Sequence, residues 1–245
     1  MLTNLLLASG LVVAGMFAWT LAEYVLHRFV MHEMVGKGMP SREHLIHHAD
    51  PQNNPGRPLL SWIGIIVVGA VLFGWSVPLL TSAVVGSGWV GLAMYAGWLL
   101  GYGTYEQIHE RSHFEAPRGR YTTWVRRHHF HHHNGHPMAN HGVTTPLWDK
   151  VFGTLEVADV IRVPRRQAMC WLVDDDGEVK AEYAPHYVLV GPAHADERLR
   201  KLDAARAFMN LPPADVSSLA HSGDAGRFAP AASSVLSVPR AVRTA

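Results

Sequence analysis

The chain has 245 residues, a formal net charge of +1 and one cysteine, Cys170, but 17 histidines. Lys+Arg 21 against Asp+Glu 20 gives no bulk electrostatic attraction to nucleic acid, so we expect no nucleic-acid partner. A single cysteine excludes an intrachain disulfide, a cysteine-based zinc site and a thiolate-ligated cluster. Any metal must therefore be bound through nitrogen and oxygen.

Two long stretches, residues 1–22 and 58–105, contain no charged side chain. The second is about twice the roughly 20 residues needed for one bilayer crossing, and it predicts two helices near residues 59–80 and 83–103. The first lacks a basic start and runs directly into "AEYVLHRFVMHE", which favours an anchoring helix over a cleaved signal peptide. We therefore expect about three transmembrane helices. The turn between the second and third is expected at Pro78, Thr81, Ser82, Gly86 and Gly88.

Basic residues give the orientation of these helices. They follow the first and third helices and are missing from the turn between the second and third, so the positive-inside rule places the intervening polar segments in the cytoplasm. The basic residues are Arg28, Lys37, Arg42, Arg57, Arg111, Arg118, Arg120, Arg126, Arg127 and Lys150. We expect an integral protein of the cell membrane in a bacterium, or of the endoplasmic reticulum in a eukaryote, with every histidine cluster on the cytoplasmic face.

Histidines recur at fixed spacings in the two polar segments. On a helix, positions i, i+3 and i+4 share a face, so each HxxHH triplet directs three imidazoles into one space and HxxxH directs two. The HxxxxH pair lies about 140° apart on an ideal helix, so that helix must end or deform there. The clusters are His27 and His32; His44, His47 and His48; His109 and His113; and, within "RRHHFHHHNGH", either His129, His132 and His133 or His128, His131 and His132.

Ten convergent imidazoles exceed the needs of one ion and predict a dinuclear metal site. Five ligands each would leave an octahedral ion one open position, whereas a structural zinc site closes with four. Ligand type alone leaves zinc and copper open. Carboxylates close to the clusters are expected to accept the second N–H of the rings or to be solvated. They are Glu23, Glu33, Glu43, Asp50, Glu106, Glu110 and Asp149.

The segments after residue 156 have a different character. "AMCWLVDDDGEVKAEYAPHYVLV" predicts two strands joined by an Asp-Gly turn, and "ADERLRKLDAARAFMN" predicts a short amphipathic helix. From residue 211 onward Ala, Ser, Pro and Gly dominate without periodicity, which is typical of a disordered tail. The fold class expected is an all-α integral membrane protein with a cytoplasmic His-rich helical cap, a small C-terminal β-hairpin and a disordered tail.

Four segments in order, "EYVLHRFVMH", "REHLIHHADP", "YEQIHERSH" and "WVRRHHFHHHNGHPMANHGVTTPLWDKVFGT", resemble the fatty acid hydroxylase/sterol desaturase superfamily of membrane di-iron enzymes. The closing "GVTTPLWDKVFGT" resembles the segment after the last histidine box of fatty acid 2-hydroxylases. Counting back from Gly142 selects His129, His132 and His133 as the last triplet and makes His128, His131, His136 and His141 neighbours.

The resemblance implies an O2-dependent lipid monooxygenase with two iron ions, for which zinc is a possible substitute, and no bound organic cofactor. The implied metal ligands are His27, His32, His44, His47, His48, His109, His113, His129, His132 and His133. Relatives often carry a fused cytochrome b5 domain, which this chain is expected to lack, so a separate electron-transfer protein of the ferredoxin or cytochrome b5 type is implied. Relatives commonly have four membrane crossings, one more than expected here.

The resulting interpretation divides the chain into a membrane histidine-box hydroxylase domain (1–156), a small cytoplasmic extension with a hairpin and a helix (157–210) and a disordered tail (211–245). The favoured substrate is a fatty acyl chain, and a sterol or carotenoid is the alternative within the superfamily. The alternative of another class is a non-redox membrane metal-binding or carrier protein. Transporters place polar ligands inside the membrane segments, whereas these histidines lie outside them, which disfavours transport.

Overall fold

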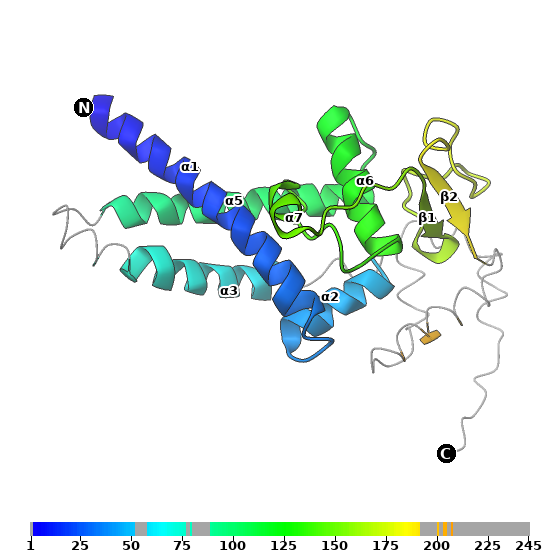
Figure 1. Cartoon of the computed structure of the whole chain (residues 1–245), viewed down its shortest axis with the longest axis horizontal. Helices are drawn as coiled ribbons and strands as arrows, with labels where there is room; N and C mark the ends of the chain where they lie inside the picture. The colour runs from blue at the N-terminus through cyan, green and yellow to red at the C-terminus, as the bar shows by residue number, and fades with distance from the viewer. Residues whose placement is uncertain are drawn as a thin grey trace, which may run out of the picture.

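The computed structural model describes residues 2–51, 58–76, 79, 89–191, 200, 203, 204 and 207. The described part is mostly helical, with one two-stranded sheet near its C-terminal end (Figure 1). The elements are α1 Leu2–Val25, η1 Leu26–His32, α2 Met39–Ala49, α3 Pro58–Gly69, η2 Ala70–Ser76, α5 Trp89–Phe114, α6 Arg120–Asn134, α7 Leu147–Phe152, β1 Ile161–Pro164, η3 Arg165–Gln167 and β2 Tyr187–Val190. Here η1 and η2 are π-helical and η3 is a 3-10 turn.

Helices α1 and α5 cross where each contributes a glycine, Gly15 of α1 and Gly97 of α5 (Figure 1). A Cβ built on Gly15 would lie 2.0 Å from Met94 O, and one on Gly97 would lie 2.0 Å from Val12 O. Backbones that approach so closely require glycine on both helices, as at the small-residue contacts of membrane helices. The crossing fixes the position of α1, and with it that of η1, relative to α5.

Helix α3 lies along α5 and is joined to it by two aromatic side chains (Figure 1). Trp98 Nε1 donates to Ile65 O at 3.1 Å, and Tyr95 Oη donates to Ile66 O at 3.1 Å. Trp98 also packs edge-on against Trp19 of α1, with ring centroids 5.1 Å apart. The three helices therefore share one aromatic core, which continues through Tyr102 to Tyr105.

Among the described residues, one helix, Thr3–His32, is long and apolar enough to cross a membrane, and Leu60–Trp75 is a shorter apolar helix. Helices occupy the places expected for the first two membrane segments, and α5 contains most of the third. The expected turn at Pro78, Thr81, Ser82, Gly86 and Gly88 lies outside the described residues. The number of crossings stays a prediction.

The prediction of a C-terminal β-hairpin is wrong. The two strands are parallel, with Ile161 opposite Tyr187 and Pro164 opposite Val190. The Asp-Gly turn exists, since Gly177 N donates to Asp174 O, but it closes a single antiparallel bridge between Val173 and Val179.

The hairpin ends early for two physical reasons. Trp171, Leu172 and Val173 are consecutive buried residues, so this segment lacks the in-and-out alternation of a strand with one solvated face. Beyond it, Lys180 O accepts the N–H groups of Tyr183 and Ala184, and these turns divert the chain from the partner strand. The strand that does form, β2, pairs instead with β1, which precedes the predicted hairpin in the chain.

The remaining expectations for the C-terminal region fall largely outside the described residues. Of the helix expected over residues 195–210, only residues 200, 203, 204 and 207 are described, and all four are helical. The tail expected over residues 211–245 lies entirely outside the described residues.

Candidate metal centre

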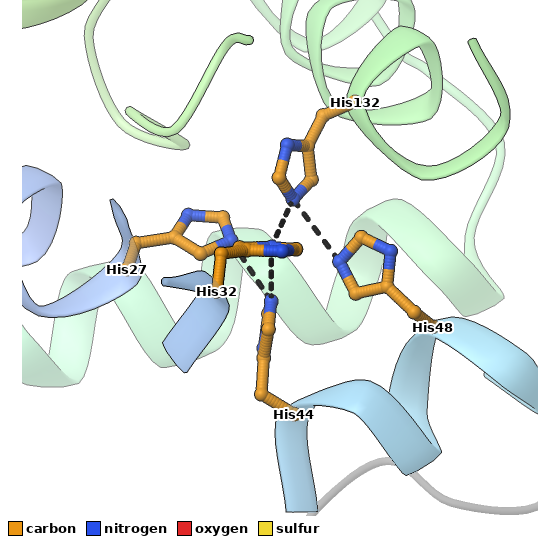
Figure 2. Close-up of side chains that lie close together, drawn as sticks. All are labelled: His27, His32, His44, His48 and His132. Carbon is orange, nitrogen blue, oxygen red and sulfur yellow. Dashed lines mark hydrogen bonds between the residues drawn. The ribbon is translucent and has the colours of Figure 1, made fainter. Parts of the chain in front are cut away.

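The ten histidines predicted as ligands lie together in two groups of five at the end of the helical bundle. Within each group, one ring nitrogen from every histidine lies within 4.8 Å of the others. We define the first group as His27, His32, His44, His48 and His132, drawn in Figure 2, and the second group as His47, His109, His113, His129 and His133. The structure thus brings all ten predicted residues together, in the register that the resemblance selected.

The π-helix η1 places His27 and His32 in one group. Its i→i+5 hydrogen bonds continue into Glu33 N→Arg28 O at 2.9 Å, so the wider turn brings residues five apart onto nearly the same side. The two imidazole centroids are 5.1 Å apart. The predicted deformation of the helix at HxxxxH is confirmed, and its form is a π-helical turn.

Helices α2 and α6 each contribute to both groups. In α2, His44 and His48 are four residues apart and join the first group, whereas His47 joins the second. In α6, His129 and His133 are four residues apart and join the second group, whereas His132 joins the first. Each HxxHH triplet therefore lies between the two groups and supplies two rings to one side and one ring to the other.

The second group is completed by α5, and the two groups are adjacent. His109 and His113 are four residues apart on α5 with ring centroids 5.1 Å apart, and His113 Nε2 lies 2.9 Å from His129 Nε2. Between the groups, the rings of His48 and His133 stack with centroids 4.0 Å apart and planes 3° apart. Two ions held by these groups would be near neighbours.

The spacing of the Nε2 atoms in the first group fits a metal ion. Along the series His27, His44, His32, His132 and His48, successive Nε2 atoms are 3.0, 2.9, 3.1 and 3.0 Å apart (Figure 2). Metal–imidazole bonds of about 2.0–2.1 Å place ligands at right angles on one ion about 2.9 Å apart, and tetrahedral ligands about 3.3 Å apart. The measured distances match the right-angled arrangement of a five- or six-coordinate ion.

Hydrogen bonding alone does not explain these contacts. A neutral imidazole Nε2 either donates one proton or accepts with one lone pair, yet the Nε2 atoms of His44, His32 and His132 each contact two others. In the second group, both ring nitrogens of His133 are buried and have no hydrogen-bond partner among the residues that the structure describes. A cation that accepts all five lone pairs of a group satisfies both observations.

Backbone carbonyls fix the tautomer of two rings in the first group. His27 Nδ1 donates to His141 O, and His132 Nδ1 donates to Ala139 O at 2.7 Å. With the proton on Nδ1, the Nε2 of each ring carries a lone pair and faces the centre of the group. Sequence reasoning expected carboxylates in this role and missed these two carbonyls, for which a side-chain pattern gives no indication.

Burial keeps the imidazoles neutral. Removal from water lowers the pKa of His44, His48, His109, His113, His129, His132 and His133 well below the ordinary value of 6.5, and neighbouring histidines lower it further. Neutral imidazole is the form that binds a metal, so the chain holds these rings ready for coordination near neutral pH.

The four histidines predicted as neighbours lie outside both groups. His131 Nε2 and His136 Nδ1 pair with the Glu156 carboxylate at 2.9 and 2.7 Å, at the surface. His128 is buried against Trp124, with its Nε2 3.4 Å from Asp149 Oδ2. His141 packs edge-on against His27 at 5.5 Å between centroids.

Among the carboxylates predicted near the clusters, Glu23 and Asp149 are buried and bind the segment that follows α6. Glu23 accepts the backbone N–H groups of Val143 and Thr144 and the Thr144 hydroxyl. Asp149 accepts the backbone N–H groups of His141 and Gly142. Burial alone would raise the pKa of Asp149, but the bonds from His128, His141, Gly142 and Thr154 outweigh it and lower that pKa below the usual range. Glu33 instead forms a surface ion pair with Arg28.

A family model described as fatty acid hydroxylase matches residues 12–154. Fatty acid 2-hydroxylase of Rattus norvegicus is 34% identical over 157 residues, which cover 60% of this chain and 39% of that protein. A dihydroceramide fatty acyl 2-hydroxylase of Arabidopsis thaliana is 29% identical over 158 residues, 64% of each chain. A solved structure of full-length scs7p, with only the hydroxylase domain visible, gives a TM-score of 0.47 at 29% identity and covers 62% of this chain and 57% of that one. The chain spans about two fifths of the length of the rat relative.

Proposed function

Because the chain belongs to the fatty acid hydroxylase family, we propose that it is a membrane-bound di-iron oxygenase that hydroxylates a C–H bond of a lipid. The observation that carries this proposal is the convergence of ten buried or half-buried imidazoles in two groups of five. Residues 1–156 would form the hydroxylase domain, and the match of the family model to residues 12–154 supports that boundary.

The two groups would hold two iron ions through ten neutral nitrogen ligands, with zinc as a substitute that binds without redox chemistry. The iron pair would supply activation of O2, so that one oxygen atom enters the C–H bond and the other is reduced to water. Five ligands per ion leave one octahedral position for that chemistry. The chain itself holds the rings neutral, orients His27 and His132 through backbone carbonyls and keeps bulk water from the buried rings.

The substrate we propose is a fatty acyl chain. The names of the rat and Arabidopsis relatives refer to fatty acids and to dihydroceramide fatty acyl groups, and these relatives match 60% and 64% of this chain. Two members of the first group, His27 and His32, lie in η1 directly after α1, and the exposed side chains of α1 include Leu6, Val13 and Phe17. An apolar helix that ends at the histidines would place the site where an acyl chain could reach it from the bilayer, on the cytoplasmic side.

The reaction requires two electrons from outside the site for each oxygen atom inserted. We propose that they come from a separate electron-transfer protein of the ferredoxin or cytochrome b5 type. His131, which pairs with Glu156 at the surface, is next to His132 in α6. The outer face of α6 therefore lies close to the first group and is where we propose that the donor binds.

The test is lipid analysis of cells that express the chain with iron and an electron donor, grown under heavy-isotope O2. We expect one labelled oxygen per product in the fatty acyl fraction, and none in cells that express His109→Ala. Label in the sterol or carotenoid fraction alone would move the substrate assignment to the alternative. An iron-loaded protein that labels no lipid with a working donor would overturn the oxygenase and favour a non-redox metal-binding protein.

A further inference from the structure

The segment of residues 139–144 connects the first histidine group to a buried carboxylate. Its Ala139 and His141 carbonyls accept the Nδ1 protons of His132 and His27, two rings of the first group. These rings come from different elements, α6 and η1, so this one segment orients ligands that the sequence places far apart.

Asp149 holds the segment in that position. It is fully buried, and its carboxylate accepts the backbone N–H groups of His141 and Gly142, both at 2.8 Å, and the Thr154 hydroxyl at 2.8 Å. The segment has little freedom to shift, because a Cβ on Gly142 would lie 2.3 Å from Thr145 O. The amide that binds Asp149 and the carbonyl that binds His27 belong to the same residue, His141.

The second group has a different support. Arg126 of α6 donates from Nη2 to Arg111 O at 2.7 Å and from Nε to Glu115 O at 2.9 Å, at the end of α5. This side chain joins the two helices that carry His109, His113, His129 and His133. Arg126 and Asp149 therefore bind different segments of the chain, Arg126 the end of α5 and Asp149 residues 141 and 142.

We propose that Asp149 is a positioning residue for the first metal ion: through residues 139–142 it sets the orientation and tautomer of His27 and His132. This inference rests on the proposed metal centre. Groups that orient a metal-bound histidine through its second N–H commonly contribute about 10–100-fold to metal affinity. Loss of Asp149 should therefore lower the affinity of the first group for its metal ion and leave the ion of the second group bound.

The experiment measures metal content rather than activity. Iron-loaded wild type, Asp149→Asn and the matched control Asp159→Asn, an exposed aspartate, are dialysed against increasing chelator. Asparagine keeps the size of the side chain but presents an N–H group where the carboxylate accepted one. We expect Asp149→Asn to lose one of its two ions at about 10–100-fold lower chelator concentration than wild type, and Asp159→Asn to follow wild type.

Double variants identify the ion that is lost. In a His27→Ala background, which lacks the first site, adding Asp149→Asn should change nothing further. In a His109→Ala background, adding Asp149→Asn should release the remaining ion at about 10–100-fold lower chelator concentration. Should Asp149→Asn fold poorly by circular dichroism, Thr154→Val removes one donor to the carboxylate and should give a smaller shift at the same site. The inference is overturned if Asp149→Asn weakens the binding of both ions equally, or of neither, or if it weakens the ion that remains in the His27→Ala background. A wild-type protein that does not hold two ions would instead overturn the metal centre itself.

Discussion

Adjacent histidines on α6 have different surroundings, although the sequence presents them as one run. His132 is fully buried with its Nε2 among the first group, whereas the ring of His131 reaches the surface and pairs with Glu156. The register that the resemblance selected places His129, His132 and His133 among the two groups, and a residue one position away on the helix points about 100° elsewhere.

The pair His132→Ala and His131→Ala tests this difference. We expect His132→Ala to lower the metal content from two ions to one and to abolish lipid hydroxylation, because the first group loses a ligand. His131→Ala should keep both ions and measurable activity. Metal analysis of the two purified proteins checks the prediction, and loss of an ion from both variants would point to the other triplet, His128, His131 and His132.

Acid should release the metal steeply. Burial lowers the pKa of His129, His132 and His133 below about 6.5, so the unfolded chain binds more protons than the folded one as pH falls past that value. Stability from these rings is therefore complete above about pH 6.5 and is lost below it, and bound metal moves the loss to lower pH. An acid titration of metal content should show uptake of several protons per ion. A shallow one-proton release centred near pH 6.5 would contradict a built site.

At the scale of elements, the π-helical turn η1 places His27 and His32 in one group. Insertion of an alanine after Phe29, an exposed residue between them, would put the two histidines six positions apart, with their rings about 120° from each other on an ordinary helix. We expect the insertion to remove the ion of the first group, whereas Phe29→Ala retains both ions. Two ions in the insertion variant would contradict the requirement that His27 and His32 share one side of η1.

The crossing of α1 and α5 offers a second test. Gly97→Ala places a methyl group against Val12 O and should destabilise the fold by roughly 1–3 kcal/mol. Gly10→Ala, where the added Cβ meets nothing within 4 Å, should be neutral or slightly stabilising, because alanine favours a helix by up to about 1 kcal/mol. Thermal unfolding in detergent compares the two variants, and equal effects would argue against the close contact.

The elements that the sequence predicted well are those with strong local patterns. The described residues of the apolar runs are helical, and the HxxHH spacing placed three rings between the two groups. The β-hairpin failed because Trp171, Leu172 and Val173 pack against Phe130 of α6, a long-range contact that no local pattern encodes. For the same reason the carbonyls of Ala139 and His141 could not be foreseen.

At the scale of the molecule, the segment after residue 156 supports the histidine-bearing helices. Gln167 Nε2 donates to His48 O at 2.7 Å and to Ala49 O at 3.2 Å, and so caps the C-terminal end of α2. Trp171 Nε1 donates to Ser112 O at the end of α5. The division into separate units at residues 156 and 157 stays a prediction, but these contacts link the described part of the extension to the helices that carry the metal centre.

Gln167→Leu tests the contribution of this cap. Leucine has a similar size but no donor, so one part-buried and one buried carbonyl at the end of α2 lose a partner. We therefore expect the free energy of unfolding to fall by about 1–3 kcal/mol. Arg162→Ala, an exposed change on β1, should stay within about 0.5 kcal/mol of wild type. Denaturant unfolding measures the free energy of unfolding of both variants. Equal values would show that the hydrogen bonds of Gln167 contribute no particular stability.

The sharing of α2 and α6 between the two groups also orders events during biosynthesis. His32 and His132 are 100 positions apart, so at about 5–20 residues per second α6 leaves the ribosome roughly 5–20 s after η1. In that interval the nascent chain already carries His27, His32, His44 and His48, an incomplete set with high affinity for copper or zinc. Which metal the finished protein contains would therefore depend on the timing of delivery as well as on the ligands. Under the proposed di-iron assignment, iron would have to arrive after the last helix is made, and competing ions would have to be kept away before it.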